Sequence, residues 1–152
     1  MVELVDDPQA VPDNVVLYRR TTWDKIGGRP TSEGIESSKI SANFFTDAPA
    51  SEAARYGLAR LCMSVGVSTV LGNRPERMLE GYPGMGLVSA KAGALRSLTK
   101  GDGTPCPQGI MLYPTEEEPW HAVVFDLTED KRSAGAAKAI ARLAAVVVPL
   151  RT

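Results

Sequence analysis

The sequence predicts a single α+β domain with a mixed or mainly antiparallel sheet of about five strands and two main helices packed on it. Short β-branched and aromatic runs recur along the chain, and helical patterns lie among them without the strict alternation of a doubly wound parallel sheet. The length of 152 residues suits one ordinary domain. Residues 1–14 contain two prolines and two adjacent aspartates, so we expect a flexible N-terminal arm there and one globular domain over residues 15–152.

The first half of the chain mixes strand and helix patterns with one long loop. Residues 15–20 (VVLYRR) are β-branched and aromatic and predict a strand that ends in two arginines. Residues 27–39 are rich in Gly, Ser and Pro and predict a surface loop. Residues 41–47 (SANFFTD) favour a second strand, and residues 47–65 favour a helix because apolar residues recur there at helical spacing. Residues 72–86 predict a loop around a turn of helix at PERML.

The second half predicts, in order, a strand, a short helix, two strands, a longer helix and an edge strand or tail. These elements cover residues 86–90, 91–99, 109–114, 121–127, 130–146 and 146–150. The strand over 121–127 (HAVVFDL) has the clearest alternation, with Val123, Phe125 and Leu127 on one face. The helix over 130–146 presents a narrow, alanine-rich face that could lie close against a sheet.

Charge and composition exclude several classes of partner and cofactor. Lys plus Arg total 17 against 18 Asp plus Glu, so the formal net charge is -1 and no nucleic-acid partner is expected. The apolar runs fall short of the ~20 residues of a membrane span, and the acidic N-terminus does not resemble a signal peptide, so we expect a soluble cytoplasmic protein without a membrane partner. One histidine and two separated cysteines, Cys62 and Cys106, supply neither a zinc set nor a disulfide framework. No metal or cofactor is therefore expected.

The only histidine, His121, lies directly after three glutamates, a proline and a tryptophan and begins the clearest strand. It either holds a chemical role at the mouth of a site or only anchors the strand by hydrogen bonds. The candidate catalytic residues are His121, Glu117 and Glu118, and the candidate binding residues are Arg19, Arg20, Trp23, Phe45, Asp47 and Trp120. Each also has a structural interpretation: arginines at a strand end pair with acids, and FFTD reads as a core aromatic pair followed by a helix cap.

Residues 42–57 (ANFFTDAPASEAARYG) resemble the second motif of ADP-ribosyltransferase-like domains. In that resemblance Arg19 is the arginine of the first motif, and Glu117 or Glu118 is the acid of the third. The resemblance implies NAD as cofactor. It further implies that the arginine holds the pyrophosphate, an aromatic ring stacks on nicotinamide and the glutamate orients the attacking nucleophile.

The order of elements over residues 15–148 also resembles a set of small uncharacterised bacterial proteins. That resemblance implies a small cytoplasmic bacterial protein. Near-neutral charge and long polar loops favour a binding or adaptor domain that acts on another protein, as in an accessory or defence operon. The alternative is an NAD-using transferase or glycohydrolase of the ADP-ribosyltransferase type, and a third hypothesis is a nuclease or peptidase that uses His121 with a nearby carboxylate.

Overall fold

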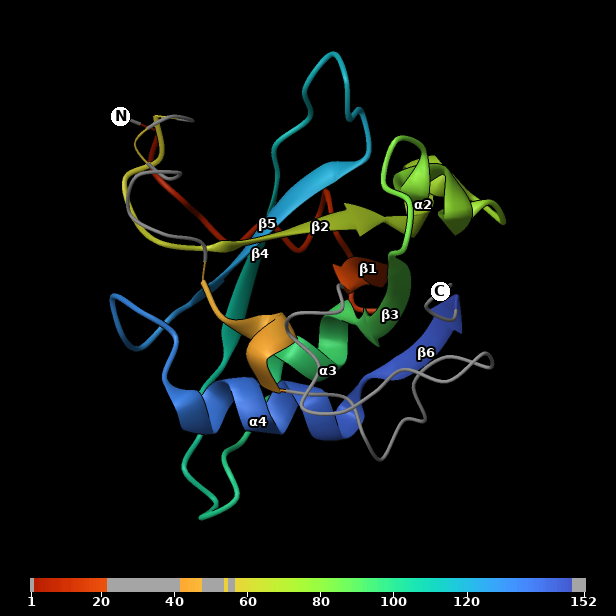
Figure 1. Cartoon of the computed structure of the whole chain (residues 1–152). Helices are drawn as coiled ribbons and strands as arrows, with labels where there is room; N and C mark the ends of the chain where they lie inside the picture. Colours follow the sequence, from red (N-terminus) through yellow and green to blue (C-terminus); the bar gives the residue numbers. More distant parts are fainter. Residues whose placement is uncertain (1, 22–41, 48–53, 55–56, 149–152) are drawn as a thin grey trace.

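In the computed structural model of the protein, residues 2–21, 42–47, 54 and 57–148 are described. These residues form one six-stranded antiparallel sheet with the strand order β4-β5-β2-β1-β3-β6 (Figure 1). The predicted α+β class and antiparallel sheet are confirmed, with six strands in place of about five.

The strands are β1 (Val16–Thr21), β2 (Met63–Val67), β3 (Gly86–Lys91), β4 (Gln108–Leu112), β5 (His121–Asp126) and β6 (Ala145–Val148). The helices are α2 (Ser68–Leu71), α3 (Ala92–Arg96) and α4 (Ala134–Leu143), with 3-10 turns η3 (Ala42–Phe45) and η4 (Pro75–Leu79). The predicted strands at β1, β3, β4, β5 and β6 are confirmed, as are the helices at α3 and α4 and the turn at PERML.

Two predictions in the first half are wrong. The residues expected to form a strand at 41–47 form the 3-10 turn η3, and the end of the helix expected over 47–65 is the strand β2. In β2 the apolar residues Met63, Val65 and Val67 alternate and face one core, while β5 and β1 supply the ladder on either side. This pairing outweighs the helical spacing of the apolar residues before it. Residues 48–53 and 55–56 of the predicted helix and the whole loop over 27–39 lie outside the described residues.

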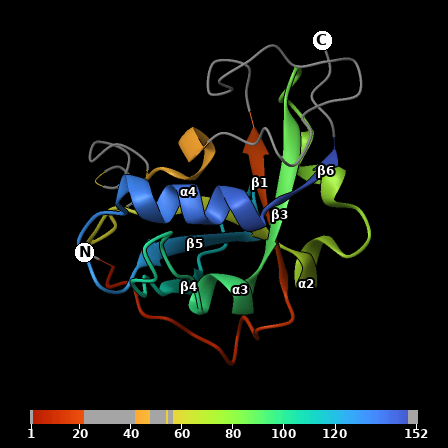
Figure 2. The ribbon, with the colours of Figure 1, turned by 90° about the horizontal axis from the view of Figure 1, so that it is seen from below.

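The helices α3 and α4 and the turn η3 cover one face of the sheet (Figure 2). The face of α4 is built from small side chains and one larger residue, Ile140, which is fully buried. Small residues allow the helix to lie close to the strands. The Ser133 side chain caps this helix by accepting a hydrogen bond of 3.1 Å from the backbone N–H of Ala136.

The opposite face carries two smaller apolar clusters. One cluster forms around Leu58, Val123 and Phe125, and the other is made of Leu71, Met78, Leu87 and Trp120. The alternation predicted for β5 is confirmed, because Val123 and Phe125 pack on this face while Ala122 and Val124 pack under the helices.

The N-terminal segment lies along the outer edge of β4. Asp6 accepts a hydrogen bond of 2.9 Å from the backbone N–H of Ile110, and the backbone N–H of Asp7 donates one of 3.0 Å to the Ile110 carbonyl. Arg96 pairs with Asp6 and Asp13. These contacts occupy a strand edge that would otherwise be open to pairing. The flexibility expected for residues 1–14 stays a prediction.

Gly109→Ala is expected to lower the free energy of unfolding by about 1–3 kcal/mol, which denaturant unfolding would measure. A Cβ at this position in β4 would lie 2.6 Å from Cζ of Phe125 and 2.9 Å from Cδ2 of Leu127, so the buried ring must move. Gly135→Ala in α4 is the matched control: its Cβ would meet only the flexible Lys100 side chain, at 3.4 Å or more. We expect this helical substitution to stabilise the protein by about 0.5 kcal/mol. Equal effects of the two substitutions would contradict the packing described at Gly109.

Candidate functional site

The sheet divides between its two central strands. β1 pairs with β2 at only two positions, Leu17↔Val67 and Tyr18↔Gly66. By contrast, β1 pairs with β3 along its whole length, and β2 pairs with β5 from Met63 to Gly66. Beyond Tyr18 the two central strands no longer form a ladder, so side chains take the place of backbone pairing there.

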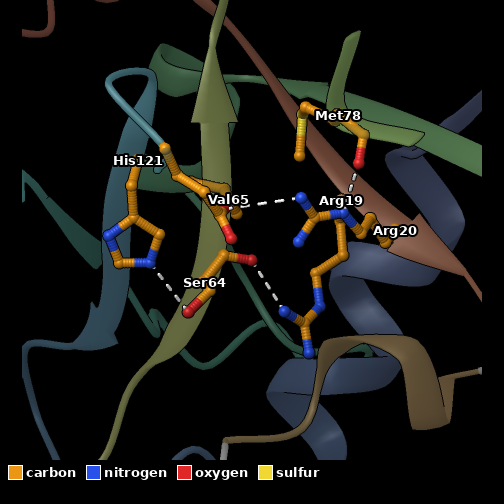
Figure 3. Close-up of a pocket in the computed structure, with 7 residues that line it drawn as sticks. Arg19, Arg20, Ser64, Val65, Met78 and His121 are labelled. Carbon is orange, nitrogen blue, oxygen red and sulfur yellow. Dashed lines mark hydrogen bonds and ion pairs between the residues drawn. The ribbon is translucent and has the colours of Figure 1, made fainter. Parts of the chain in front are cut away.

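A pocket of about 50 Å³ opens at this division (Figure 3). It is lined by Arg19, Arg20, Ser64, Val65, Met78, Glu118 and His121. Four of these residues, Arg19, Arg20, Glu118 and His121, are candidates from the sequence. Arg19 and Arg20 come from β1, His121 begins β5 and Glu118 lies in the loop before it. β1 and β5 lie on opposite sides of β2 in the sheet. Antiparallel pairing thus brings together residues that are about a hundred positions apart in the chain.

His121 makes two hydrogen bonds at the pocket. Its Nδ1 lies 2.7 Å from the carbonyl oxygen of Tyr113, and its Nε2 lies 3.0 Å from Oγ of Ser64 (Figure 3). The Tyr113 ring meets the imidazole edge to face at 6.1 Å between centroids. The two hydrogen bonds hold the imidazole ring in one orientation. The ring is half-buried and lines the pocket.

The two arginines approach the pocket from β1 and are held by backbone carbonyls. Nη1 of Arg19 donates a hydrogen bond of 2.7 Å to the Ser64 carbonyl and so spans the division between β1 and β2. Nε of Arg20 donates one of 2.6 Å to the Met78 carbonyl, and its guanidinium lies 3.9 Å from the centre of the Tyr82 ring. These contacts fix two positive charges at the pocket, as anion recognition requires.

The acidic run before β5 contributes one carboxylate to the site. Oε2 of Glu118 lies 3.5 Å from Nη2 of Arg20, with the two side chains 27% and 18% exposed. This contact confirms that an acid of the run pairs with an arginine of β1, as the structural interpretation of these arginines expects. Glu117 is exposed and does not line the pocket. The geometry therefore favours Glu118 over Glu117.

Two of the three aromatic candidates, Trp120 and Phe45, do not line the pocket. Trp120 is 7% exposed and packs in the cluster with Leu71 and Met78. Phe45 is 2% exposed under α4, where it borders an apolar cavity of about 10 Å³ together with Arg19. The core interpretation of Phe45 is confirmed, and a ring buried in this way is not placed to stack on a ligand. Trp23 lies outside the described residues.

Asp47 belongs to a buried polar network on the helical side of the sheet. Its Oδ1 lies 2.6 Å from Nη1 of Arg132, and the two side chains are 1% and 0% exposed. Arg132 also donates hydrogen bonds to the side chain of Gln108 and to the carbonyls of Phe45 and Val124. Burial lowers the pKa of Arg132, and the Asp47 carboxylate opposes this shift. Asp47 therefore anchors η3 to the sheet and does not reach the pocket.

Asp126→Asn is expected to destabilise the protein at neutral pH, with a smaller loss in acid. Burial tends to raise the pKa of Asp126, but hydrogen bonds from Thr128, Gln108 and Glu129 outweigh it, so the pKa lies below its ordinary 3.8. A lowered pKa means that the ionised carboxylate stabilises the fold above about pH 4 and that this contribution is lost as the pH falls through the folded-state pKa. Urea unfolding at several pH values, with exposed Asp130→Asn as control, measures the effect. A difference from wild type that does not change with pH would contradict it.

Sequence reasoning missed three contributors to the site: Ser64, Met78 and Tyr113. Ser64 was assigned to a helix, which would have pointed it away from β5, whereas the alternating pattern MSVGV could have identified it as a strand residue. Among the described residues no group of three or more His, Cys, Asp or Glu is arranged to hold a metal ion. No helix in the same part of the chain is long and apolar enough to cross a membrane.

Comparisons with protein-family models, with curated proteins and with solved structures each found no match to this chain. The function proposed below rests on the pocket and on the motif resemblance of residues 42–57.

Proposed function

We propose that this protein is an NAD-using transferase or glycohydrolase of the ADP-ribosyltransferase-like type and that the pocket between β1 and β2 is its active site. The observation that carries the proposal is that Arg19 and Glu118 line one pocket, with Ser64 between them on β2. The sequence resemblance requires the arginine and the acid to face one cleft beside Phe45; Arg19 and Glu118 line the same pocket, whereas Phe45 is buried in the core under α4.

The donor set of the pocket fits part of a dinucleotide. Arg19 and Arg20 bring two fixed guanidinium groups, which suit the charge and the oxygen geometry of a phosphate. The pocket of about 50 Å³ is much smaller than the roughly 300–1,000 Å³ of complete small-molecule sites. It can therefore enclose one charged group of NAD and not the whole molecule.

NAD supplies an ADP-ribosyl group whose bond to nicotinamide is broken in the reaction. The arginines of β1 hold phosphate oxygens and hold the reacting end of the ligand at the division in the sheet. The Ser64 hydroxyl, 3.0 Å from His121, offers a hydrogen bond at the same place. Glu118 reaches the pocket from the opposite side and, as the resemblance implies, orients the acceptor.

Incubation of the purified protein with NAD, followed by measurement of free nicotinamide, tests this function. We expect nicotinamide to be released when water or a supplied protein is the acceptor. Heat-denatured protein is the control for spontaneous hydrolysis. The absence of both release and NAD binding would contradict the proposal.

A second candidate function, a binding or adaptor domain for another protein, is favoured by the edge strand β6. Within the described residues β6 pairs with β3 alone, and its Val147 is 40% exposed. An edge strand with an exposed apolar residue can add a strand from a partner. Val147→Lys should then weaken capture of that partner without changing NAD turnover, and unchanged capture would contradict this function.

A further inference from the structure

We infer that His121 is the catalytic base of this pocket and that it takes the acceptor's proton through the hydroxyl of Ser64. The inference rests on the proposed function and deepens it, since the resemblance gives the orienting role to a glutamate and no role to the histidine. The hydrogen bonds of the His121 ring support this role.

The tautomer of His121 follows from its partners. The carbonyl oxygen of Tyr113, 2.7 Å from Nδ1, can only accept, so Nδ1 must carry a hydrogen. In the neutral ring Nε2 then has a free lone pair, and the Ser64 hydroxyl at 3.0 Å donates to it. A backbone carbonyl thus fixes the basic nitrogen toward the pocket, the role that a carboxylate has in many catalytic histidine pairs.

The acids near the pocket are less suited to this proton transfer. Glu118 is engaged in an ion pair with Arg20, at 3.5 Å between Oε2 and Nη2. Glu117 is exposed and outside the pocket. The charged groups that line the pocket with His121 are Arg19 and Arg20 of β1 and Glu118 before β5.

The step balances without a further reagent. The acceptor oxygen forms a bond to C1′ of the ribose, and the bond from C1′ to nicotinamide breaks with its electron pair leaving on the nicotinamide nitrogen. The acceptor's proton passes to Oγ of Ser64 as the Ser64 proton passes to Nε2 of His121. After the products leave, solvent removes the proton from the imidazolium.

Because His121 is the only histidine of the chain, one nitrogen NMR experiment reads its tautomer without assignment. In ¹⁵N-labelled protein at mildly alkaline pH we expect a protonated Nδ1 and an unprotonated Nε2. A ring protonated at Nε2 instead would overturn the inference.

His121→Gln tests the chemistry directly, because glutamine keeps a hydrogen-bonding amide near the position of Nε2 but cannot take up a proton. We expect nicotinamide release to fall by about 100-fold or more, with NAD affinity within about twofold of wild type. Retained release in His121→Gln, while wild type is active, overturns the inference and leaves the proposed function standing. Failure of the wild type to bind or cleave NAD overturns both.

Discussion

Asp47→Ala is expected to lower the free energy of unfolding by about 3–5 kcal/mol, the largest stability effect of any substitution considered. The change removes the carboxylate that lies 2.6 Å from Nη1 of Arg132 and leaves a guanidinium buried with its main charge partner gone. The backbone N–H of Arg132 also loses its acceptor, because it donates to Oδ2 of Asp47 at 2.7 Å. The remaining acceptors, Gln108 and two carbonyls, are neutral.

Denaturant unfolding of Asp47→Ala measures this loss, with exposed Glu116→Ala as the control for removing a negative charge. Asp47→Asn keeps a side-chain acceptor for Arg132 and should cost less than the alanine substitution. A loss below about 1 kcal/mol for Asp47→Ala would be typical of an exposed ion pair. Such a result would contradict the buried network around Arg132.

Arg19→Ala is expected to lower kcat/KM for nicotinamide release by about 100-fold, the largest effect on activity among the arginine substitutions. Each charge-assisted hydrogen bond to a phosphate contributes about 1.5–3 kcal/mol, and a tenfold change corresponds to about 1.4 kcal/mol. The substitution also removes the hydrogen bond to the Ser64 carbonyl that spans β1 and β2. The lost phosphate contact and the lost hydrogen bond to Ser64 both affect the part of the pocket where the reaction is proposed to take place.

Arg74→Ala is the matched control for Arg19→Ala, because its side chain is 67% exposed and its ion pair among the described residues is with the neighbouring Glu76. It should leave nicotinamide release unchanged. Circular dichroism of both variants separates a lost contact from a lost fold. If Arg19→Ala kept the activity of wild type, the phosphate-binding role of Arg19 would be wrong.

The strands of this fold could be predicted where their own sequence shows the period of the structure. β5 alternates, and β1, β3 and β4 have β-branched or apolar runs bounded by turn residues, so local pattern and tertiary pairing agree. β2 could not be predicted in the same way. Its apolar residues follow others at helical spacing, and only its position between β1 and β5 decides the strand.

The site was predictable in part for the same reason. Arg19, Arg20 and His121 lie on elements that were predicted correctly, and Glu118 directly precedes one of them. Ser64 was missed because its strand was missed. Phe45 and Asp47 lie away from the pocket, a placement that the sequence does not show because Arg132, 85 positions after Asp47, completes the buried network around them.

Calorimetric titration of the wild-type protein with NAD tests most directly whether the division between β1 and β2 is a dinucleotide site. Binding does not need an acceptor, so the measurement separates recognition from chemistry. We expect saturable binding of NAD and of ADP-ribose, and at least tenfold weaker binding of nicotinamide riboside, which lacks the pyrophosphate held by Arg19 and Arg20. No heat of binding with NAD, or equal affinity for nicotinamide riboside, would contradict the proposed site.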